Sequence, residues 1–381
     1  MNQPLKVLTI GHSYVVNSNR STMERVAEDK NFAITLVAPE FFHGDLRSLS
    51  CEPATRDAGY DLVKTPVVMS RRIHVFLYRG LQEIMRREKF DLVHIWEEPY
   101  IFSGFQVAKL AKKMGLPYFF ITYQNLDKKY PPPFSQMENF VVKNSAAWVT
   151  GAELVKKTLV ARGYDAGSCH MIPLNLDIGK YTVDKQQARR NLERKFGKIQ
   201  GRLIGFTGRF EVDKGIDEIL IALEMQKEPW TFVGLGKGEL REKILLWAQS
   251  KGFAERVHLD LVKHSEVQDY LPGFDVLLAP SRTMPNWKEQ FGRMIIEAFA
   301  CKVPVIGSDS GEIPYVIGEC GIVVPEKDGQ KLGQALTRLL QDEALMAELV
   351  EKGYDRVASL YTAESAAQGY KQLYTKLAGR L

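Results

Sequence analysis

The sequence contains 381 residues, of which 45% are hydrophobic and 25% charged, with a net charge of +5 and four cysteines. This length and composition favour a soluble enzyme with two domains of ordinary size. There is no run of about 18 apolar residues and no signal-peptide core at the N-terminus, so we expect a cytoplasmic protein without a transmembrane helix. The cysteines are widely spaced, which favours reduced structural thiols over a zinc site.

The excess positive charge lies in the first half of the chain, where residues 1–175 hold 22 Lys and Arg against 17 Asp and Glu. It gathers in adjacent pairs: Arg71-Arg72, Arg86-Arg87, Lys112-Lys113, Lys128-Lys129 and Lys156-Lys157. Solvated helix faces are one explanation. The other is an acidic acceptor or peripheral contact with an anionic membrane, worth on the order of 1 kcal/mol per well-placed cation. No aromatic residues interleave with these pairs in a nucleic-acid-binding motif, so no nucleic acid partner is expected.

Short apolar runs alternate with helical patterns along the whole chain, which is typical of βαβ units and parallel sheets. The expected strands are residues 6–10, 34–38, 92–95, 118–122, 147–150 and 169–173, then 202–207, 230–233, 257–261, 275–279, 304–306 and 321–324. Residues 183–197 read as a charged connecting segment, which puts the domain boundary near 174–184. The pattern predicts two doubly wound α/β domains that bind ligands beyond the carboxyl ends of their strands. The cleft between the domains is the default active site.

Two glutamates stand eight positions apart in Glu289-Gln-Phe-Gly-Arg-Met-Ile-Ile-Glu297. The amides of Gly292 and Arg293 would open the helix that carries Glu297, and helix N-termini attract phosphate. Eight positions is slightly more than two helical turns, so one ligand could be gripped at two points along its length.

A second polar motif, Phe206-Thr-Gly-Arg-Phe-Glu-Val-Asp-Lys-Gly215, opens the second half. A strand ends there in a glycine turn, and two cations, Arg209 and Lys214, precede the next helix. A planar guanidinium and a compact ammonium together suit a diphosphate. Surface ion pairs with Glu211 and Asp213 are the alternative. The presence of the Glu289–Glu297 motif after a strand of the same domain favours the diphosphate.

Polar residues also follow two strands of the first half. Gly11 begins a glycine turn after the first strand. The glycine is explained either by a plain turn or by a ligand that approaches the backbone closely. After the third strand, His94, Trp96, Glu97 and Glu98 precede a proline. His94 is interpreted either as a structural histidine or as part of a functional cluster with the residues that follow it.

Several of these motifs together resemble the retaining glycosyltransferases of family 4, also called glycosyl transferases group 1. The resemblance is carried by Gly208-Arg209 with Lys214-Gly215, Pro280-Ser281, Glu289-x-Phe-Gly with Glu297-Ala298, and Pro304-Val305-Ile306. The resemblance is strong over about residues 200–330. In the first half of the chain it is limited to the order of the expected strands and helices. It implies a GT-B fold of two facing Rossmann-like domains, with residues 1–178 on the acceptor side and residues 179–362 binding the nucleotide sugar. A terminal helix near 363–381 would join the first domain.

The resemblance also implies roles in the second domain. Arg209 and Lys214 would clamp the donor diphosphate, Glu297 would bind ribose hydroxyls and Glu289 would contact the transferred sugar. Backbone groups would bind the rest of the nucleotide, in the loop around Val262 and at Phe291, Gly292 and Arg293.

In the first domain the resemblance implies that Gly11 faces the donor. Many relatives carry His-x-His-Glu-Pro near the third strand, whereas this chain reads His94-Ile-Trp-Glu-Glu-Pro99. Either His94 makes the sugar contact or Trp96 replaces the second histidine. Glu97 and Glu98 would then hydrogen-bond or deprotonate an acceptor hydroxyl.

The implied activity is that of a retaining, metal-independent hexosyltransferase without a cofactor. It would use a UDP- or GDP-sugar and a saccharide or lipid-linked acceptor in polysaccharide biosynthesis. No Asp-x-Asp pair follows a strand, which fits metal independence. Two alternatives remain open. A nucleotide-sugar epimerase or hydrolase of the same fold would turn over the donor alone, and a non-catalytic nucleotide-sugar-binding protein would show no acceptor-dependent release of nucleotide.

Overall fold

The computed structural model describes residues 3–43 and 48–379, which fall into two compact units. Unit 1 runs to Pro173 and takes up the chain again from Ala363, and unit 2 is Leu174–Thr362. Residues 1–2 and 44–47 of the first expected domain, and the last two residues of the expected terminal helix, lie outside the described residues. No helix in the described ranges is both long and apolar enough to cross a membrane.

Unit 1 is built on a parallel sheet that has seven strands in the described part of the chain. In spatial order they are β11 (Cys169–Met171), β10 (Ala147–Thr150), β9 (Tyr118–Ile121), β8 (Leu92–Ile95), β1 (Leu5–Ile10), β2 (Phe32–Pro39) and β5 (Asp61–Thr65). After β1 the chain adds strands on one side, and from β8 onward it adds them on the other. The carboxyl ends of β1 and β8 therefore form the switch point at which ligands bind in sheets of this kind.

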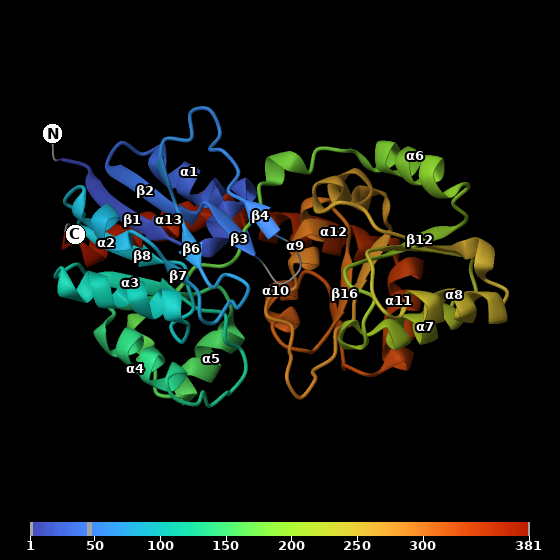
Figure 1. Ribbon diagram of the computed structural model, residues 1–381. Coiled ribbons are helices and arrows are strands. Elements are labelled where there is room, and N and C mark those ends of the chain that lie inside the picture. The colour runs from blue at the N-terminus through green and yellow to red at the C-terminus, as the bar shows by residue number, and fades with distance from the viewer. Residues whose placement is uncertain (1–2, 44–47, 380–381) are drawn as a thin grey trace. The chain divides into compact units, whose positions relative to one another are not determined.

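Helices cover both faces of this sheet (Figure 1). They are α1 (Ser21–Ala27), α2 (Leu81–Arg86), α3 (Phe102–Lys113), α4 (Phe134–Asn144), α5 (Glu153–Ala161) and α13 (Ala363–Leu377). Side chains alternate between the faces of a strand. In β8, Leu92 packs with α1 and α13, whereas Val93 packs with α2 and α3.

Helix α13 belongs to unit 1 although it is the last helix of the chain, and in Figure 1 its red ribbon lies among the blue elements. Tyr370, Leu373 and Tyr374 are buried, and Leu377 packs beside them. These four residues form one apolar stripe, because positions three and four apart share one face of a helix.

Five strands of unit 1 were not expected from the sequence. One is the sheet edge β5, and the others form two antiparallel pairs, β3 (Phe41–His43) with β4 (Ser48–Ser50) and β6 (Val67–Val68) with β7 (Leu77–Tyr78). Segments of two or three residues carry too little periodicity to be recognised in advance.

Unit 2 holds a second parallel sheet, with six strands among the residues described. Their order is β14 (Val257–Asp260), β13 (Trp230–Leu235), β12 (Arg202–Thr207), β15 (Val276–Ala279), β16 (Val305–Ser308) and β17 (Ile322–Val324). The helices are α6 (Lys185–Phe196), α7 (Ile216–Glu224), α8 (Arg241–Ser250), α9 (Arg293–Ala300), α10 (Ile313–Ile317), α11 (Gly329–Gln341) and α12 (Glu343–Leu360). Every strand that the sequence predicted in either half is present, and the predicted α/β fold of two Rossmann-like units is confirmed.

Helix α6 occupies most of the segment that the sequence suggested was a charged connector. The Asp184 carboxylate caps it by accepting a hydrogen bond from the Gln187 amide at 2.8 Å. Lys185 and Arg189 pair with the largely buried Asp275 at 2.7 and 2.6 Å. Their charge is therefore used to hold the helix against its own unit.

His94 lies in the interior of unit 1, between the sheet and α13. Its ring stacks on Phe119 and Tyr370 with centroids 4.5 and 4.9 Å away, and Nδ1 is 2.8 Å from the Tyr374 hydroxyl. The side chain is 0% exposed, and burial lowers the pKa of His94 to about 3. A residue in this position ties β8 to the terminal helix, and no atom of it is accessible to a sugar.

We expect His94→Phe to weaken the dependence of stability on pH. The unfolded histidine titrates near 6.5, whereas the pKa of folded His94 is about 3. Protonation therefore favours the unfolded chain, and stability that is present above pH 6.5 is lost as the pH falls toward 3. Between pH 6.5 and 5 the loss amounts to about 1.5 kcal/mol, which denaturant unfolding at the two pH values measures.

Tyr374→Phe is the matched control, because it removes the hydrogen-bond partner and leaves the imidazole in place. That variant should keep the acid sensitivity of the parent protein. An acid sensitivity in His94→Phe equal to that of the parent would contradict the assignment.

Candidate functional site

The carboxyl edge of the unit 2 sheet is formed by closely packed backbone. The Gly208 amide donates to the Leu235 carbonyl at 3.0 Å, and the Gly236 amide donates to the Asp260 carbonyl at 2.8 Å. A Cβ added at Gly236 would overlap the carbonyl oxygen of Gly208. The turns after β12 and β13 therefore touch each other directly, which only glycine allows at this point.

Lys214 is the most enclosed cation at this edge. Its Nζ lies 2.7 Å from Oε2 of Glu289 and 4.2 Å from the centre of the Trp287 ring. The two side chains of the ion pair are only 11% and 12% exposed. The next residue, Gly215, has φ +70° and stands against the Pro280 carbonyl, which fixes where Lys214 leaves the backbone. An ammonium held between a carboxylate and an aromatic face is strongly localised.

Glu289 links this lysine to the start of α9. Its Oε1 accepts a hydrogen bond from the Gly292 amide at 3.2 Å, while Oε2 faces Lys214. Gly292 has φ +84°, a left-handed conformation that turns the chain into the helix beginning at Arg293. The structure thus brings Lys214, Glu289 and Gly292 into one connected group.

Arg209 joins the same group through Asp213. Its guanidinium pairs with Glu211 and lies 3.1 Å from Asp213 Oδ2, and that same oxygen is 3.9 Å from Lys214 Nζ. Arg209 is 51% exposed, so its pairs are weak individually. The surface ion pairs that the sequence offered as an alternative do form, and they draw both cations toward one anionic oxygen.

Glu297 lies one turn farther along α9 and is buried. It accepts a hydrogen bond from Arg293 Nε at 3.1 Å, and it contributes to the raised pKa of Tyr181, whose first cause is burial. The Phe291 side chain packs in the core against Tyr361, so only its backbone faces the loop. Val262 follows β14 and packs partly into the same core.

In unit 1, Gly11 follows β1 and lies directly beside Trp96, the residue that follows β8. Its φ of −166° is ordinary extended backbone, so conformation does not require glycine here. A Cβ would however lie 2.9 Å from the Cβ of Trp96. The Trp96 ring packs edge-on against Tyr14, with centroids 4.7 Å apart. Gly11 is therefore explained by close packing against Trp96.

Glu97 is buried and accepts hydrogen bonds on both oxygens. Oε1 accepts from the His12 amide at 2.7 Å and from the Tyr78 hydroxyl at 2.6 Å, and Oε2 lies 2.7 Å from His12 Nδ1. Burial raises the pKa of the Tyr78 hydroxyl, and the neighbouring Glu97 raises it further. These contacts direct the Glu97 carboxylate into the interior of unit 1.

Glu98 turns toward the next strand. Its oxygens accept hydrogen bonds from the Thr122 hydroxyl at 2.7 Å and from the Tyr123 amide at 2.8 Å. Burial raises the pKa of Glu98 to about 7, and the two hydrogen bonds only partly oppose that rise. A carboxyl group with this pKa exchanges protons readily near neutral pH.

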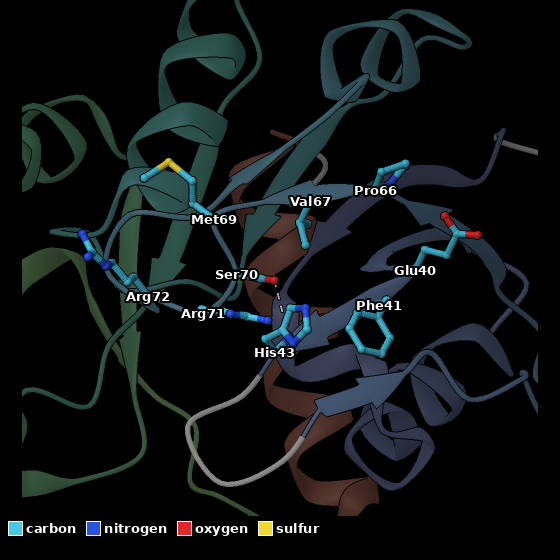
Figure 2. A pocket seen from close by; sticks show the side chains of 9 residues that line it. All are labelled: Glu40, Phe41, His43, Pro66, Val67, Met69, Ser70, Arg71 and Arg72. Carbon is cyan, nitrogen blue, oxygen red and sulfur yellow. Dashed lines mark hydrogen bonds between the residues drawn. The ribbon is translucent and has the colours of Figure 1, made fainter.

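A separate pocket of about 500 Å³ lies on unit 1 beside the segment that follows β6 (Figure 2). Figure 2 shows Arg71 and His43 beside Ser70, with Met69 before and Arg72 after them in the same segment as Ser70. Phe41 and Met69 are exposed, and Met69 adopts φ +61°. Apolar side chains and two guanidinium groups thus share one surface.

Some residues of these groups were missed by the sequence analysis. Trp287 stands two positions before Glu289, and its place over Lys214 depends on a tight turn from Met284. His12 follows Gly11 directly in the polar turn after the first strand, and no separate role was predicted for it. Tyr78 lies on a two-residue strand, and nothing in the sequence marks it.

Comparison with known proteins identifies a family over part of the chain. Residues 188–356 match the family described as glycosyl transferases group 1. A D-inositol 3-phosphate glycosyltransferase of Corynebacterium jeikeium is 23% identical over 300 residues, covering 74% of this chain and 68% of the relative. The putative teichuronic acid biosynthesis glycosyltransferase TuaC of Bacillus subtilis is 22% identical over 302 residues, covering 77% and 73%.

Solved structures of similar fold extend over nearly the whole chain. A glycosyltransferase from Rickettsia africae superposes with a TM-score of 0.77 at 14% identity, covering 99% of both chains. Anabaena HepE in complex with UDP superposes with a TM-score of 0.73 at 12% identity, covering 98% of this chain and 100% of that one. At these identities the likeness establishes the fold, which is that of GT-B glycosyltransferases.

We expect Gly236→Ala to destabilise unit 2. The new methyl group overlaps the Gly208 carbonyl, so the turns after β12 and β13 must separate at a cost of about 2 kcal/mol. In a unit of this size that corresponds to a fall in melting temperature of about 6 °C, measured by calorimetry. Gly167→Ala, whose methyl group would meet only ordinary contacts, is the control. Equal melting temperatures for the two variants would argue against the close packing described.

Proposed function

The chain belongs to the glycosyl transferases group 1 family through residues 188–356, and from this premise we propose that it is a retaining hexosyltransferase. It transfers a sugar from a nucleoside-diphosphate donor to a saccharide or lipid-linked acceptor in the assembly of a polysaccharide. TuaC, which is named for teichuronic acid biosynthesis, supports the pathway class. The UDP held by HepE makes UDP-sugars the first donors to test.

The observation that carries the proposal is the convergence of Arg209 and Lys214 on one anionic oxygen. In the structure that oxygen belongs to Asp213, 3.1 and 3.9 Å from the two cations. A diphosphate offers several such oxygens and more charge than one carboxylate. It can therefore replace the weaker pairs of Arg209 while Lys214 keeps Glu289 as a neighbour.

The reaction needs positive charge at the leaving group. As the bond between the anomeric carbon and the β-phosphate oxygen breaks, negative charge grows on the phosphate. Fixed cations and aimed amides stabilise that charge most in the transition state. Arg209, Lys214 and the amides from Phe291 to Arg293 supply this stabilisation in our proposal, and no metal ion is required. The acceptor attacks the same face of the sugar, and its proton passes to the departing phosphate.

Two acidic residues bind the remainder of the donor. Glu297, near the start of α9, accepts hydrogen bonds from the ribose hydroxyls in place of Arg293. Glu289 keeps its ion pair with Lys214 and contacts the hydroxyls of the transferred sugar through its carboxylate oxygens. The backbone around Val262 contacts the nucleobase.

Lys214→Ala should abolish the binding of nucleoside diphosphates. Without the ammonium the diphosphate loses its enclosed cation, and Glu289 is left without its principal counter-charge. A ligand present at 100 times its dissociation constant stabilises the parent by about 2.7 kcal/mol. A thermal-shift panel of UDP, GDP, UDP-glucose and GDP-mannose measures the loss.

Lys243→Ala is the control for this panel, because it also removes one lysine ammonium, but from an exposed ion pair that α8 makes with Asp217. Its thermal shifts should equal those of the parent. A Lys214→Ala protein that folds and keeps the full shift would remove the diphosphate assignment.

We further propose that unit 1 contacts an anionic lipid surface of the cytoplasmic membrane face through the pocket of Figure 2. Arg71 and Arg72 would attract lipid phosphates while the exposed Phe41 and Met69 meet the apolar boundary. Basic residues next to exposed apolar ones are the composition that interfacial binding requires. The protein would then be peripheral, at the site where a lipid-linked acceptor is presented.

The double variant Arg71→Ala/Arg72→Ala should bind phosphatidylglycerol vesicles about 30-fold more weakly, because each cation contributes about 1 kcal/mol. Vesicle co-sedimentation at low and high salt measures this, with phosphatidylcholine vesicles as the neutral reference. Arg86→Ala/Arg87→Ala removes the same charge at the end of α2 and serves as the matched variant. Similar losses in both double variants would show an effect of net charge alone and overturn the assignment.

A further inference from the structure

Trp287 lies against the ammonium of Lys214 at the carboxyl edge of the unit 2 sheet. The centre of its ring is 4.2 Å from Lys214 Nζ, well inside the distance of about 6 Å over which a cation is attracted to an aromatic face. The Lys214 side chain is only 11% exposed, so water screens this attraction less than it would on an open surface. The contact therefore restricts where the ammonium can lie.

The loop that carries Trp287 holds the ring in place through its own backbone. The Met284 amide donates to the Trp287 carbonyl at 2.8 Å, and the Trp287 amide donates to the Met284 carbonyl at 3.3 Å. Pro285 and Asn286 stand between them, and both residue types favour turns. The Trp287 side chain is itself partly buried. Its position over Lys214 is thus built into a tight turn of the chain.

An aromatic ring at this point has an advantage over another acidic side chain. The carboxylates of Glu289 and Asp213 already lie 2.7 and 3.9 Å from Lys214 Nζ. A further carboxylate would hold the ammonium but would also repel a phosphate that approaches it. The Trp287 ring attracts the cation and carries no net charge. It can therefore restrain Lys214 without competing with an anionic ligand.

The ring also leaves hydrogen-bonding capacity on the ammonium. A lysine ammonium has three N–H groups, and Glu289 Oε2 accepts from Lys214 at 2.7 Å. Asp213 Oδ2, at 3.9 Å, is beyond hydrogen-bonding distance. Attraction to the Trp287 face is electrostatic and uses no oxygen acceptor. The restrained ammonium can therefore still donate to phosphate oxygens.

We propose that Trp287 is a positioning residue of the diphosphate site, which holds the Lys214 ammonium where a phosphate group binds. This inference rests on the proposed function and deepens it, because it takes Lys214 as the cation that binds the diphosphate. Trp287 acts through Lys214 and makes no contact with the nucleoside. A cation that is restrained before the ligand arrives loses less conformational freedom on binding, which increases affinity.

Trp287→Leu removes the aromatic face and keeps an apolar side chain. The affinities for UDP and for inorganic pyrophosphate should both fall about fivefold, because a ligand must then immobilise a more mobile lysine. Trp287→Phe keeps an aromatic face and should stay within about twofold of the parent. Isothermal titration calorimetry measures the dissociation constants, with GDP in place of UDP if the thermal-shift panel selects it.

Trp247→Leu is the matched control for these titrations. It makes the same substitution on α8, where the Trp247 indole donates to Glu224 at 2.6 Å, and it should leave both dissociation constants unchanged. Pyrophosphate contains no base and no sugar, so it reports the phosphate contacts alone. Equal losses for UDP and pyrophosphate in Trp287→Leu would therefore support an effect that passes through Lys214.

A second measurement needs no ligand. Lys214→Met removes the charge and keeps most of the length of the side chain, so it can be combined with Trp287→Leu in a double-mutant cycle. In urea unfolding, the effects of the two single variants on the unfolding equilibrium constant should depart from additivity by about fivefold, since the substitutions remove one shared attraction. Additive effects would overturn the restraint of Lys214 by the ring.

The outcomes separate this inference from the proposed function. A parent protein that binds neither nucleoside diphosphates nor pyrophosphate would overturn the proposed function itself. Normal binding of both ligands by Trp287→Leu would overturn only the role of Trp287. A loss for UDP with pyrophosphate unchanged would also overturn it, because the ring would then contact the nucleoside. Equal losses in Trp287→Phe and Trp287→Leu would show that the size of the indole matters and not its aromatic face, again against the inference.

Discussion

The arrangement in unit 2 depends on one ion pair, between Lys214 and Glu289 at 2.7 Å. Both side chains are largely buried, and charges in such places are tolerated only when they are paired. The pair joins the loop after β12 to the loop before α9, two segments 75 residues apart in the sequence. It also keeps a cation enclosed before any ligand arrives, so little rearrangement is needed when a phosphate approaches.

The neighbouring backbone serves the same purpose. Glycines at 208, 215, 236 and 292 either adopt left-handed conformations or stand where a Cβ would collide with another loop. They let the turns at the carboxyl edge crowd together, which brings amides and the Lys214 side chain into one small region. Preorganised donors and cations stabilise developing charge without reorganisation. The density of glycine at this edge is therefore a requirement of the site as well as of the fold.

The strands were predictable from the sequence because most are buried on both faces and read as short continuous apolar runs, as in Tyr118–Ile121. The two small antiparallel pairs of unit 1 were not, since β6 and β7 have only two residues each. The charged run now seen as α6 was assigned to a connector because its apolar positions are few. The helix is held to its unit by the pairing of Arg189 with Asp275. These residues lie 86 positions apart, so the local sequence of the helix does not reveal the pairing.

The cation group of unit 2 was predictable for a simpler reason. Arg209, Lys214 and Glu289 all follow strands of one parallel sheet, and the carboxyl ends of parallel strands share an edge. The role of Asp213 was not predictable in this way. Its carboxylate competes with any ligand for both cations and at the same time draws them together. Such a double role depends on side-chain rotamers that the spacing of residues does not determine.

In unit 1, the position of His94 follows from the alternation of side chains along β8 and not from the spacing of its sequence motif. Residues 92 and 94 of β8 lie on one face and residues 93 and 95 on the other, because the period of a strand is two. Leu92 packs beneath α13, so His94 must face the same helix and cannot reach the sheet edge. Glu97 comes after the strand has ended and is not bound to that face. Its carboxylate crosses to the end of β1, where Oε2 lies 2.7 Å from Nδ1 of His12. The motif alone suggested a place for His94 at the sheet edge, whereas the parity of β8 puts its ring inside unit 1 against α13.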